Sequence, residues 1–270
     1  MNKTSTDFDS PWKDTLEWYF EPFIRLCFPK IHSAIDWSYS CQFLDKELQK
    51  VVRDAQTGRR FADKLVQVWL LDGQQTWILI HVEVQGKREK NFAQRMYTYN
   101  HRIADRYNRS VLSLAVLCDS NSRWRPTKFK STILGCCIEF KFLIVKLLDY
   151  KEKWEEMEQS GNPFATVIMA HIKSLETRRN QQQRQTWKMS LTRRLYEQGY
   201  QKQDVLNLFH FIDWVMKLPQ GLEQAFLQEI TEYEKEQNMP YITSVERIGM
   251  ERGRQEGRQE GRQEGRQEGL

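Results

Sequence analysis

Two segments rich in β-branched and aromatic residues, 61–71 and 76–85, flank the tetrapeptide Asp72-Gly73-Gln74-Gln75. An Asp-Gly pair between two such segments is a strong signal for a β-hairpin. With the turn centred near Gly73, the numbers of paired residues sum to about 146, so Asp63 lies opposite Glu83. Directly opposed residues share one face of a hairpin, with Cβ atoms about 4.5–5.5 Å apart. The sequence therefore predicts two carboxylates side by side on one pair of strands.

Such a pair of carboxylates is unstable by itself, because like charges directly opposite each other repel. A bound cation removes the repulsion, and Mg²⁺ or Mn²⁺ is the natural candidate because both prefer hard oxygen ligands. Gln85 has the same strand parity as Glu83 and is expected on the same face, and the backbone carbonyl of Val84 is a further candidate ligand. The alternative requires no metal: both carboxylates would pair at the rim of the sheet with the neighbouring basic residues Lys64, Lys87 and Arg88.

The remaining pattern predicts an α/β domain with a mixed sheet flanked by helices, followed by an all-helical C-terminal domain. We expect one helix over residues 10–27, a helix over 91–107, and strands over 111–118 and 138–145. A charged segment and the breaker Gly161-Asn162-Pro163 follow, so we place the domain boundary at residue 150. The helical domain then covers residues 151–248, with helices over 164–175, 187–198, 204–218 and 221–237.

The last part of the chain, residues 249–270, contains four copies of Gly-Arg-Gln-Glu. Glycine at every fourth position disfavours an isolated helix. Arginine and glutamate are equally numerous after Met250, with five of each, so the tail is not a basic arm. We expect a flexible segment or a frayed helix, with pairing to a second copy of the chain as the alternative.

Charge is unevenly distributed along the chain. Residues 87–130 contain eleven lysines and arginines against three acidic residues, an excess of eight in a chain whose net charge is +5. Nucleic-acid backbone is the natural partner of such a stretch. The helix over residues 91–107 carries Arg95 and Arg102 beside its apolar stripe, and both are candidates for contacting phosphate.

Several classes of protein are not expected. No run of 18 apolar residues is present, and the N-terminal residues lack a signal-peptide pattern, so we expect a cytoplasmic protein without a membrane partner. The five cysteines are odd in number and form no C-x-x-C pair, which favours buried thiols over disulfides or a zinc site. His81 lies on the same side of its strand as Glu83, and a single histidine there is expected to be structural.

Residues 61–107 resemble the PD-(D/E)XK nuclease superfamily, specifically its recombination-promoting nuclease and putative transposase (Rpn) family in the form common in cyanobacteria. The resemblance covers most of residues 7–250, although its catalytic motif is short. The matching segments are Phe61-Ala62-Asp63-Lys64-Leu65, Ile80-His81-Val82-Glu83-Val84-Gln85 and Phe92-Ala93-Gln94-Arg95-Met96-Tyr97, with Asp9-Ser10-Pro11-Trp12-Lys13 and Phe43-Leu44-Asp45-Lys46-Glu47-Leu48.

The resemblance implies a restriction-endonuclease-like core in which Asp63 and Glu83 hold the metal. Gln85 stands where the superfamily usually has a lysine that orients water and offsets charge, and glutamine brings no charge. Lys87 is a candidate for the missing charge. An upstream carboxylate completes many such sites, and Glu17 and Glu47 are the candidates here.

The expected function is a Mg²⁺-dependent DNA endonuclease linked to recombination or transposition, with RNA as the other possible substrate. Lys87, Arg88, Arg95 and Arg102 would contact the nucleic acid. The alternative is an inactive or weakly active nucleic-acid-binding or interaction protein that keeps the nuclease fold. A homodimer is a further possibility.

Overall fold

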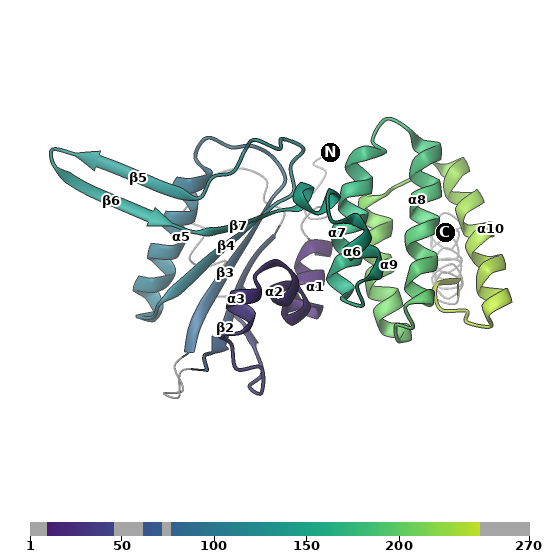
Figure 1. The fold of residues 1–270 in the computed structure, drawn as a ribbon, viewed down its shortest axis with the longest axis horizontal. Helices are drawn as coiled ribbons and strands as arrows, with labels where there is room; N and C mark the ends of the chain where they lie inside the picture. Colours follow the sequence, from purple (N-terminus) through teal and green to yellow (C-terminus); the bar gives the residue numbers. More distant parts are fainter. Residues whose placement is uncertain (1–9, 46–61, 72–76, 244–270) are drawn as a thin grey trace, which may run out of the picture. The chain divides into compact units, whose positions relative to one another are not determined.

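The computed structural model describes residues 10–45, 62–71 and 77–243, and the chain divides into two compact units, residues 1–175 and 176–270. Unit 1 has the expected α/β architecture, a five-stranded mixed sheet with helices on both faces (Figure 1). Unit 2 is helical in its described part. None of the described helices is long and apolar enough to cross a membrane.

The first predicted helix is split in two. Helix α1 (Ser10–Trp18) ends one residue before Tyr19, and α2 (Phe20–Cys27) follows at once, before the short α3 (Pro29–His32). Pro22 has no N–H, and its ring clashes with the carbonyl four residues earlier, that of Trp18. The expectation of one continuous helix over residues 10–27 is therefore wrong at this proline.

The predicted hairpin forms with the predicted register. Strand β2 (Ala62–Trp69) pairs antiparallel with β3 (Trp77–Gln85), and Asp63 is opposite Glu83. The short strand β1 (Gln42–Phe43) borders β2, and β4 (Val111–Leu117) and β7 (Leu143–Lys146) extend the sheet in parallel beyond β3. The sheet order is β1-β2-β3-β4-β7.

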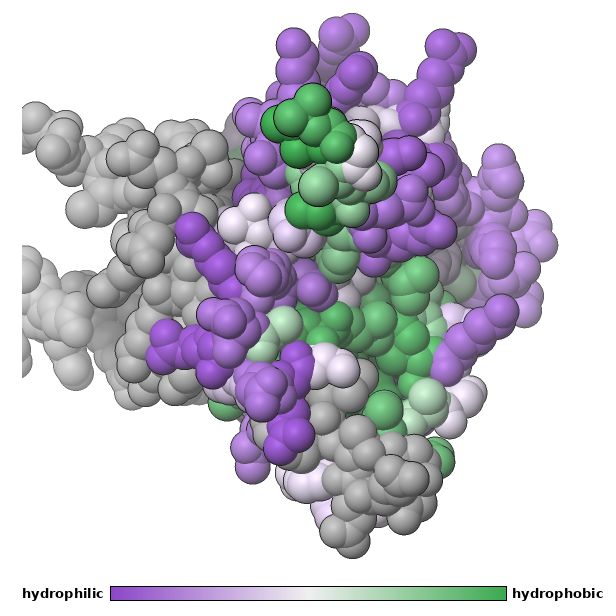
Figure 2. Space-filling model, turned by 90° about the vertical axis from the view of Figure 1, so that its left-hand side faces the viewer, coloured by the Kyte–Doolittle hydropathy of each residue, from purple (hydrophilic) through white to green (hydrophobic). Residues whose placement is uncertain are grey.

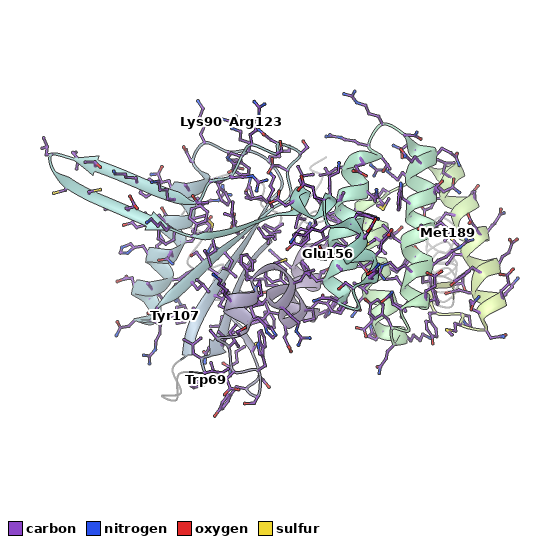
Figure 3. All side chains as sticks on the ribbon, viewed as in Figure 1. Trp69, Lys90, Tyr107, Arg123, Glu156 and Met189 are labelled. Carbon is purple, nitrogen blue, oxygen red and sulfur yellow. The ribbon has the colours of Figure 1, made fainter. Side chains whose placement is uncertain are left out.

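Helix α5 (Phe92–Tyr107) connects β3 to its parallel neighbour β4, as parallel strands require a crossover. The carboxyl ends of β3 and β4 therefore meet at one edge of the sheet. Figure 3 shows Lys90 and Arg123, from the loops after these two strands, projecting outward at that edge, whereas Tyr107 and Trp69 lie near the opposite end.

Each face of the sheet has its own helices. Helix α5 covers the face that carries Leu65 and Leu79, which pack with Tyr99 and Ile103. Helices α1–α3 lie on the other face (Figure 1). Between them, β3 is buried throughout the part from Leu79 to Gln85, including the charged Glu83.

The strand expected over residues 138–145 is two strands in two different sheets. Strands β5 (Lys128–Ile133) and β6 (Cys136–Lys141) form a separate antiparallel hairpin, and β7 begins after Phe142. Phe142 is buried among the α5 side chains Phe92 and Met96. The expectation of buried thiols also fails here, because Cys136 and Cys137 are exposed while Cys118 is buried.

The segment after the sheet belongs to unit 1 as far as Leu175. The 3-10 turn η1 (Leu147–Lys151) and α6 (Trp154–Gln159) lead to α7 (Pro163–Glu176). Phe164 of α7 packs against Trp12 and Phe23, with ring centroids 6.4 and 4.9 Å apart. These contacts explain why the division lies after residue 175, whereas the sequence placed it at residue 150.

Unit 2 contains α8 (Gln181–Glu197), α9 (Lys202–Val215) and α10 (Gln220–Gln237), close to the predicted helices. Lys188 of α8 is fully buried and donates hydrogen bonds to Asp213 of α9 at 2.6 Å and to Glu223 of α10 at 2.8 Å. One buried ammonium therefore links all three helices. The repeat tail of residues 249–270 lies outside the described residues.

We predict a pH dependence of stability from His171 on α7. Burial lowers its pKa, although Nε2 contacts the carbonyl of Cys118 at 2.7 Å. The folded state therefore favours neutral imidazole. This stabilisation is complete above the unfolded pKa of about 6.5 and is lost as pH falls through the lowered folded pKa. Urea unfolding between about pH 7 and pH 5 should show a shallower loss of stability in His171→Gln than in the wild type.

The exposed histidine of α5 provides the control for this measurement. His101→Gln should keep the wild-type dependence of unfolding free energy on pH. A slope in His171→Gln equal to that of the wild type would contradict the prediction.

Candidate functional site

Asp63 and Glu83 occupy a close pair of positions in the sheet. The carbonyl of Leu65 accepts a hydrogen bond from Leu44 on the β1 side, and that of Gln85 accepts one from Cys118 on the β4 side. The backbone N–H and C=O groups of successive residues point to opposite sides of a strand. In β2 and β3, those of the odd-numbered residues point away from the space between the two strands. Asp63 and Glu83 are thus a non-hydrogen-bonded pair, the kind with Cα atoms about 4.5 Å apart.

Glu83 is completely buried, and its partner is an arginine of helix α5. Arg95 donates from Nη2 to Glu83 Oε1 at 3.0 Å and to Gln85 Oε1 at 2.6 Å. The other terminal nitrogen of Arg95, Nη1, contacts the carboxylate of Glu89. Gln85 is held at its second end as well, because Nε2 donates to the carbonyl of Lys87 at 2.5 Å. One guanidinium therefore binds both predicted site residues of β3.

The charge of this arginine is stabilised where it lies. Burial by itself lowers the pKa of Arg95, but the carboxylates of Glu83 and Glu89 outweigh burial and raise the pKa above its ordinary value. Arg95 was expected to face nucleic acid. The structure instead directs its guanidinium inward, with a side chain only 8% exposed. Arg102, the second arginine expected to contact phosphate on this helix, is half-buried.

The second carboxylate oxygen of Glu83, Oε2, is buried and has no hydrogen-bond partner among the described residues. Nε2 of His81 lies 3.7 Å from it. His81 itself is fully buried and lies edge-on to the ring of Tyr99. A buried carboxylate oxygen without a partner is costly. Such an oxygen fits a hard cation, which would take it as a ligand.

The full donor set of a metal is not contained in the described side chains. Among these residues, no group of three or more His, Cys, Asp and Glu side chains is arranged to hold an ion. Asp63 is described only by its backbone position opposite Glu83, so its role as a ligand stays a prediction. The carbonyl of Val84 faces β2 within the sheet, and its role also stays a prediction.

The structure places Glu17 away from Glu83. Glu17 Oε2 accepts a hydrogen bond from Nζ of Lys64 at 2.6 Å, and Asp45 contacts the same nitrogen at 2.5 Å. Lys64 neighbours Asp63 in β2, and successive side chains of a strand point to opposite faces. Glu17 therefore lies on the face of α1, whereas Glu83 lies on that of α5. Its expected place as the third carboxylate is wrong for this reason, and Glu47 lies outside the described residues.

Lys87 and Arg88 are exposed just beyond the end of β3. Lys87 was expected on the same face as Gln85 by strand parity, but parity ends with the strand at Gln85. Instead, a basic rim lies at the carboxyl ends of β3 and β4. It consists of Lys87, Arg88, Lys90 and Arg123, of which the last two are labelled in Figure 3.

Sequence reasoning missed the inward orientation of Arg95 and the contribution of Glu89. One signal was available, because Arg95 follows Phe92 by three residues and precedes Tyr99 by four. Both aromatic residues belong to the buried stripe of α5, so helical spacing places Arg95 on the same side. Glu89 precedes the helix, and no periodic pattern identifies it.

We predict that removing the guanidinium destabilises unit 1 through Glu83. Arg95→Met leaves the Glu83 carboxylate buried without its cation, which typically costs about 3–5 kcal/mol. In the double variant Glu83→Met/Arg95→Met no buried charge is left unpaired, because Glu89 is partly exposed, so the loss should be smaller than the sum of the two single losses. Urea unfolding measures each free energy.

Arg106 lies exposed on the same helix and supplies the matched control. Arg106→Met should change the free energy of unfolding by less than about 0.5 kcal/mol. If Arg95→Met is as mild as Arg106→Met, the ion pair does not stabilise the fold.

The geometry of β3 and α5 thus presents a buried glutamate, a glutamine and an arginine in one hydrogen-bonded cluster at the carboxyl end of the central strand. Comparisons of the chain with models of protein families, with curated proteins and with solved structures found no match.

Proposed function

We propose that this chain is a metal-dependent nuclease that hydrolyses phosphodiester bonds of DNA, with Asp63 and Glu83 holding Mg²⁺ or Mn²⁺. The observation that carries the proposal is the buried Oε2 of Glu83, which has no hydrogen-bond partner among the described residues. Asp63, the residue directly opposite, is the second ligand. The metal, when bound, would activate water and stabilise charge on the phosphate.

In this proposal Arg95 takes the part that lysine has in the PD-(D/E)XK superfamily. It binds the oxygen of Gln85, the residue at the lysine position, at 2.6 Å. Its fixed positive charge lies within 3.0 Å of Glu83 Oε1. The guanidinium holds Glu83 by one oxygen and leaves the other for the metal. The same charge would offset the negative charge that develops on a phosphate during hydrolysis.

The restriction-endonuclease-like core belongs to the same proposal. It is supported by the mixed sheet, by the antiparallel pair β2–β3 and by helix α5 between β3 and β4. The basic rim at the carboxyl ends of β3 and β4 supports a polyanionic substrate. A link with recombination or transposition rests on the resemblance alone.

The second candidate function is nucleic-acid binding without cleavage. It is favoured by the complete burial of Glu83 and by its ion pair with Arg95, because a carboxylate neutralised by an arginine is stable without a metal. Both functions predict DNA binding, so only cleavage separates them.

We predict that the wild type nicks supercoiled plasmid in Mg²⁺ and not in EDTA. Asp63→Ala should reduce nicking to the level seen in EDTA, because it removes the proposed ligand opposite Glu83. Asp105→Ala is the control, since Asp105 is an exposed carboxylate of α5. Gel analysis of nicked plasmid measures the rate. DNA binding without Mg²⁺-dependent nicking, unchanged by Asp63→Ala, would support the second candidate.

We also predict that the positive charge can be moved from Arg95 to position 85. Arg95→Met should reduce nicking, and Gln85→Lys should reduce stability, because a lysine beside Arg95 places two cations together. The double variant Gln85→Lys/Arg95→Met should recover part of the nicking that Arg95→Met loses. Equal nicking rates in Arg95→Met and the double variant would show that the charge itself is not required.

A further inference from the structure

Hairpin β5–β6 extends away from the five-stranded sheet of unit 1 as a two-stranded ribbon (Figure 1). Each strand contains six residues and spans roughly 20 Å. Leu134 and Gly135 form the turn, both with positive φ, 46° and 88°. The ribbon pairs with no other strand of the described chain.

One face of the ribbon is apolar, and only its base is covered. Phe129 and Phe140 are opposite each other and contact Tyr97 of α5, with ring centroids 5.2 and 5.8 Å apart. Towards the tip, Ile133 and Ile138 are 70% and 45% exposed. Figure 2 shows a hydrophobic patch among hydrophilic side chains on this side of the molecule.

The turn itself breaks a local rule. Leu134 is 100% exposed and has a left-handed backbone conformation, which is unfavourable for a bulky side chain. Asn-Gly is the usual choice for such a turn. Leucine at this position costs conformational energy and also exposes apolar surface, which contact of the tip with a partner would bury.

The opposite face of the ribbon is basic. Lys128 and Lys141 are directly opposite each other, an arrangement that repels. Lys130 is opposite Glu139, whose pKa is lowered first by Lys141 and then by Lys128. Three lysines against one glutamate leave two positive charges on an exposed strand pair. Glu139 already pairs with Lys141 at 3.3 Å, and a further anion, such as a phosphate, would offset the two remaining positive charges.

We propose that the β5–β6 ribbon is an arm that enters the major groove of duplex DNA, with its lysines on phosphates and its tip against bases. This proposal rests on the proposed function, because it takes DNA as the substrate. The major groove of B-form DNA admits a two-stranded ribbon, whereas that of an RNA duplex is too deep and narrow. In the major groove, an apolar side chain can contact the C5 methyl group of thymine. A second copy fits less well, because two like-charged arms would meet.

Helix α5 contacts both the arm, through Tyr97, and the proposed active site, through Arg95. Tyr97, which supports the base of the arm, is two residues from Arg95 on α5. A duplex held by the arm is therefore positioned relative to Glu83 through a single rigid element.

The test measures binding of the full chain to a short DNA duplex in EDTA by fluorescence anisotropy at several salt concentrations. The triple variant Lys128→Gln/Lys130→Gln/Lys141→Gln should bind more weakly and reduce the slope of log K against log salt by about 2–3, at about 0.9 per lost phosphate contact. The matched control is Lys153→Gln/Lys217→Gln/Lys235→Gln, three exposed lysines elsewhere. It should keep the wild-type slope.

A second variant tests the tip. Leu134→Asn retains the left-handed turn but removes the apolar side chain. It should keep the hairpin and bind a thymine-containing duplex more weakly than the wild type does, with no such loss on the same duplex carrying uracil, which lacks the C5 methyl group, in place of thymine. Circular dichroism confirms that each variant is folded.

Three results would overturn the arm. One is an unchanged affinity and salt slope in the lysine variant. Another is equal binding of duplex RNA and duplex DNA by the wild type. The third is a tip variant that converts a dimer to a monomer in sedimentation while DNA affinity stays constant. If binding depends on the arm but the wild type does not nick plasmid, the proposed nuclease is contradicted and the proposed arm is supported. If the wild type nicks plasmid but binding does not depend on the arm, the proposed arm is contradicted and the nuclease is supported.

Discussion

A carboxylate buried in the centre of a sheet must have a positive charge beside it, and this requirement organises unit 1. Glu83 lies on β3, which is covered on both faces, and its side chain has no exposed surface among the surrounding residues. Helix α5 provides Arg95, and the crossover that makes β3 and β4 parallel also brings this arginine over the end of β3. The ion pair thus joins the strand and the helix whose packing forms the core on that face.

The hairpin register could be predicted from the sequence because turn residues and alternating patterns both depend on local geometry. Asp72-Gly73 and the strand parity together place Asp63 opposite Glu83, as the structure confirms. The boundaries of α5 and β4 were predicted for the same reason. The break between α1 and α2 was also readable, from Pro22, although the apolar spacing across it suggested one helix.

The partners of the charged residues could not be predicted in the same way. Lys64 meets Glu17 and Asp45 across 47 and 19 residues of chain, and nothing in the local pattern indicates such pairing. Strand parity alone predicts opposite faces for Lys64 and its neighbour at position 63, and this prediction already separates Glu17 from Glu83. The β5–β6 hairpin was missed because most of its residues are exposed. Without a buried face, its lysines and isoleucines do not form the apolar–polar alternation that identifies a strand.

The arm also carries two adjacent thiols, Cys136 and Cys137, which begin β6 and are exposed to solvent. The other cysteines react less readily, since burial raises the pKa of Cys27 to about 12 and also raises the pKa of Cys41 and Cys118. Thiolate is the reactive form. A thiol-directed fluorophore should therefore attach to the arm first, so the unmodified sequence already provides a handle for observing how this hairpin moves.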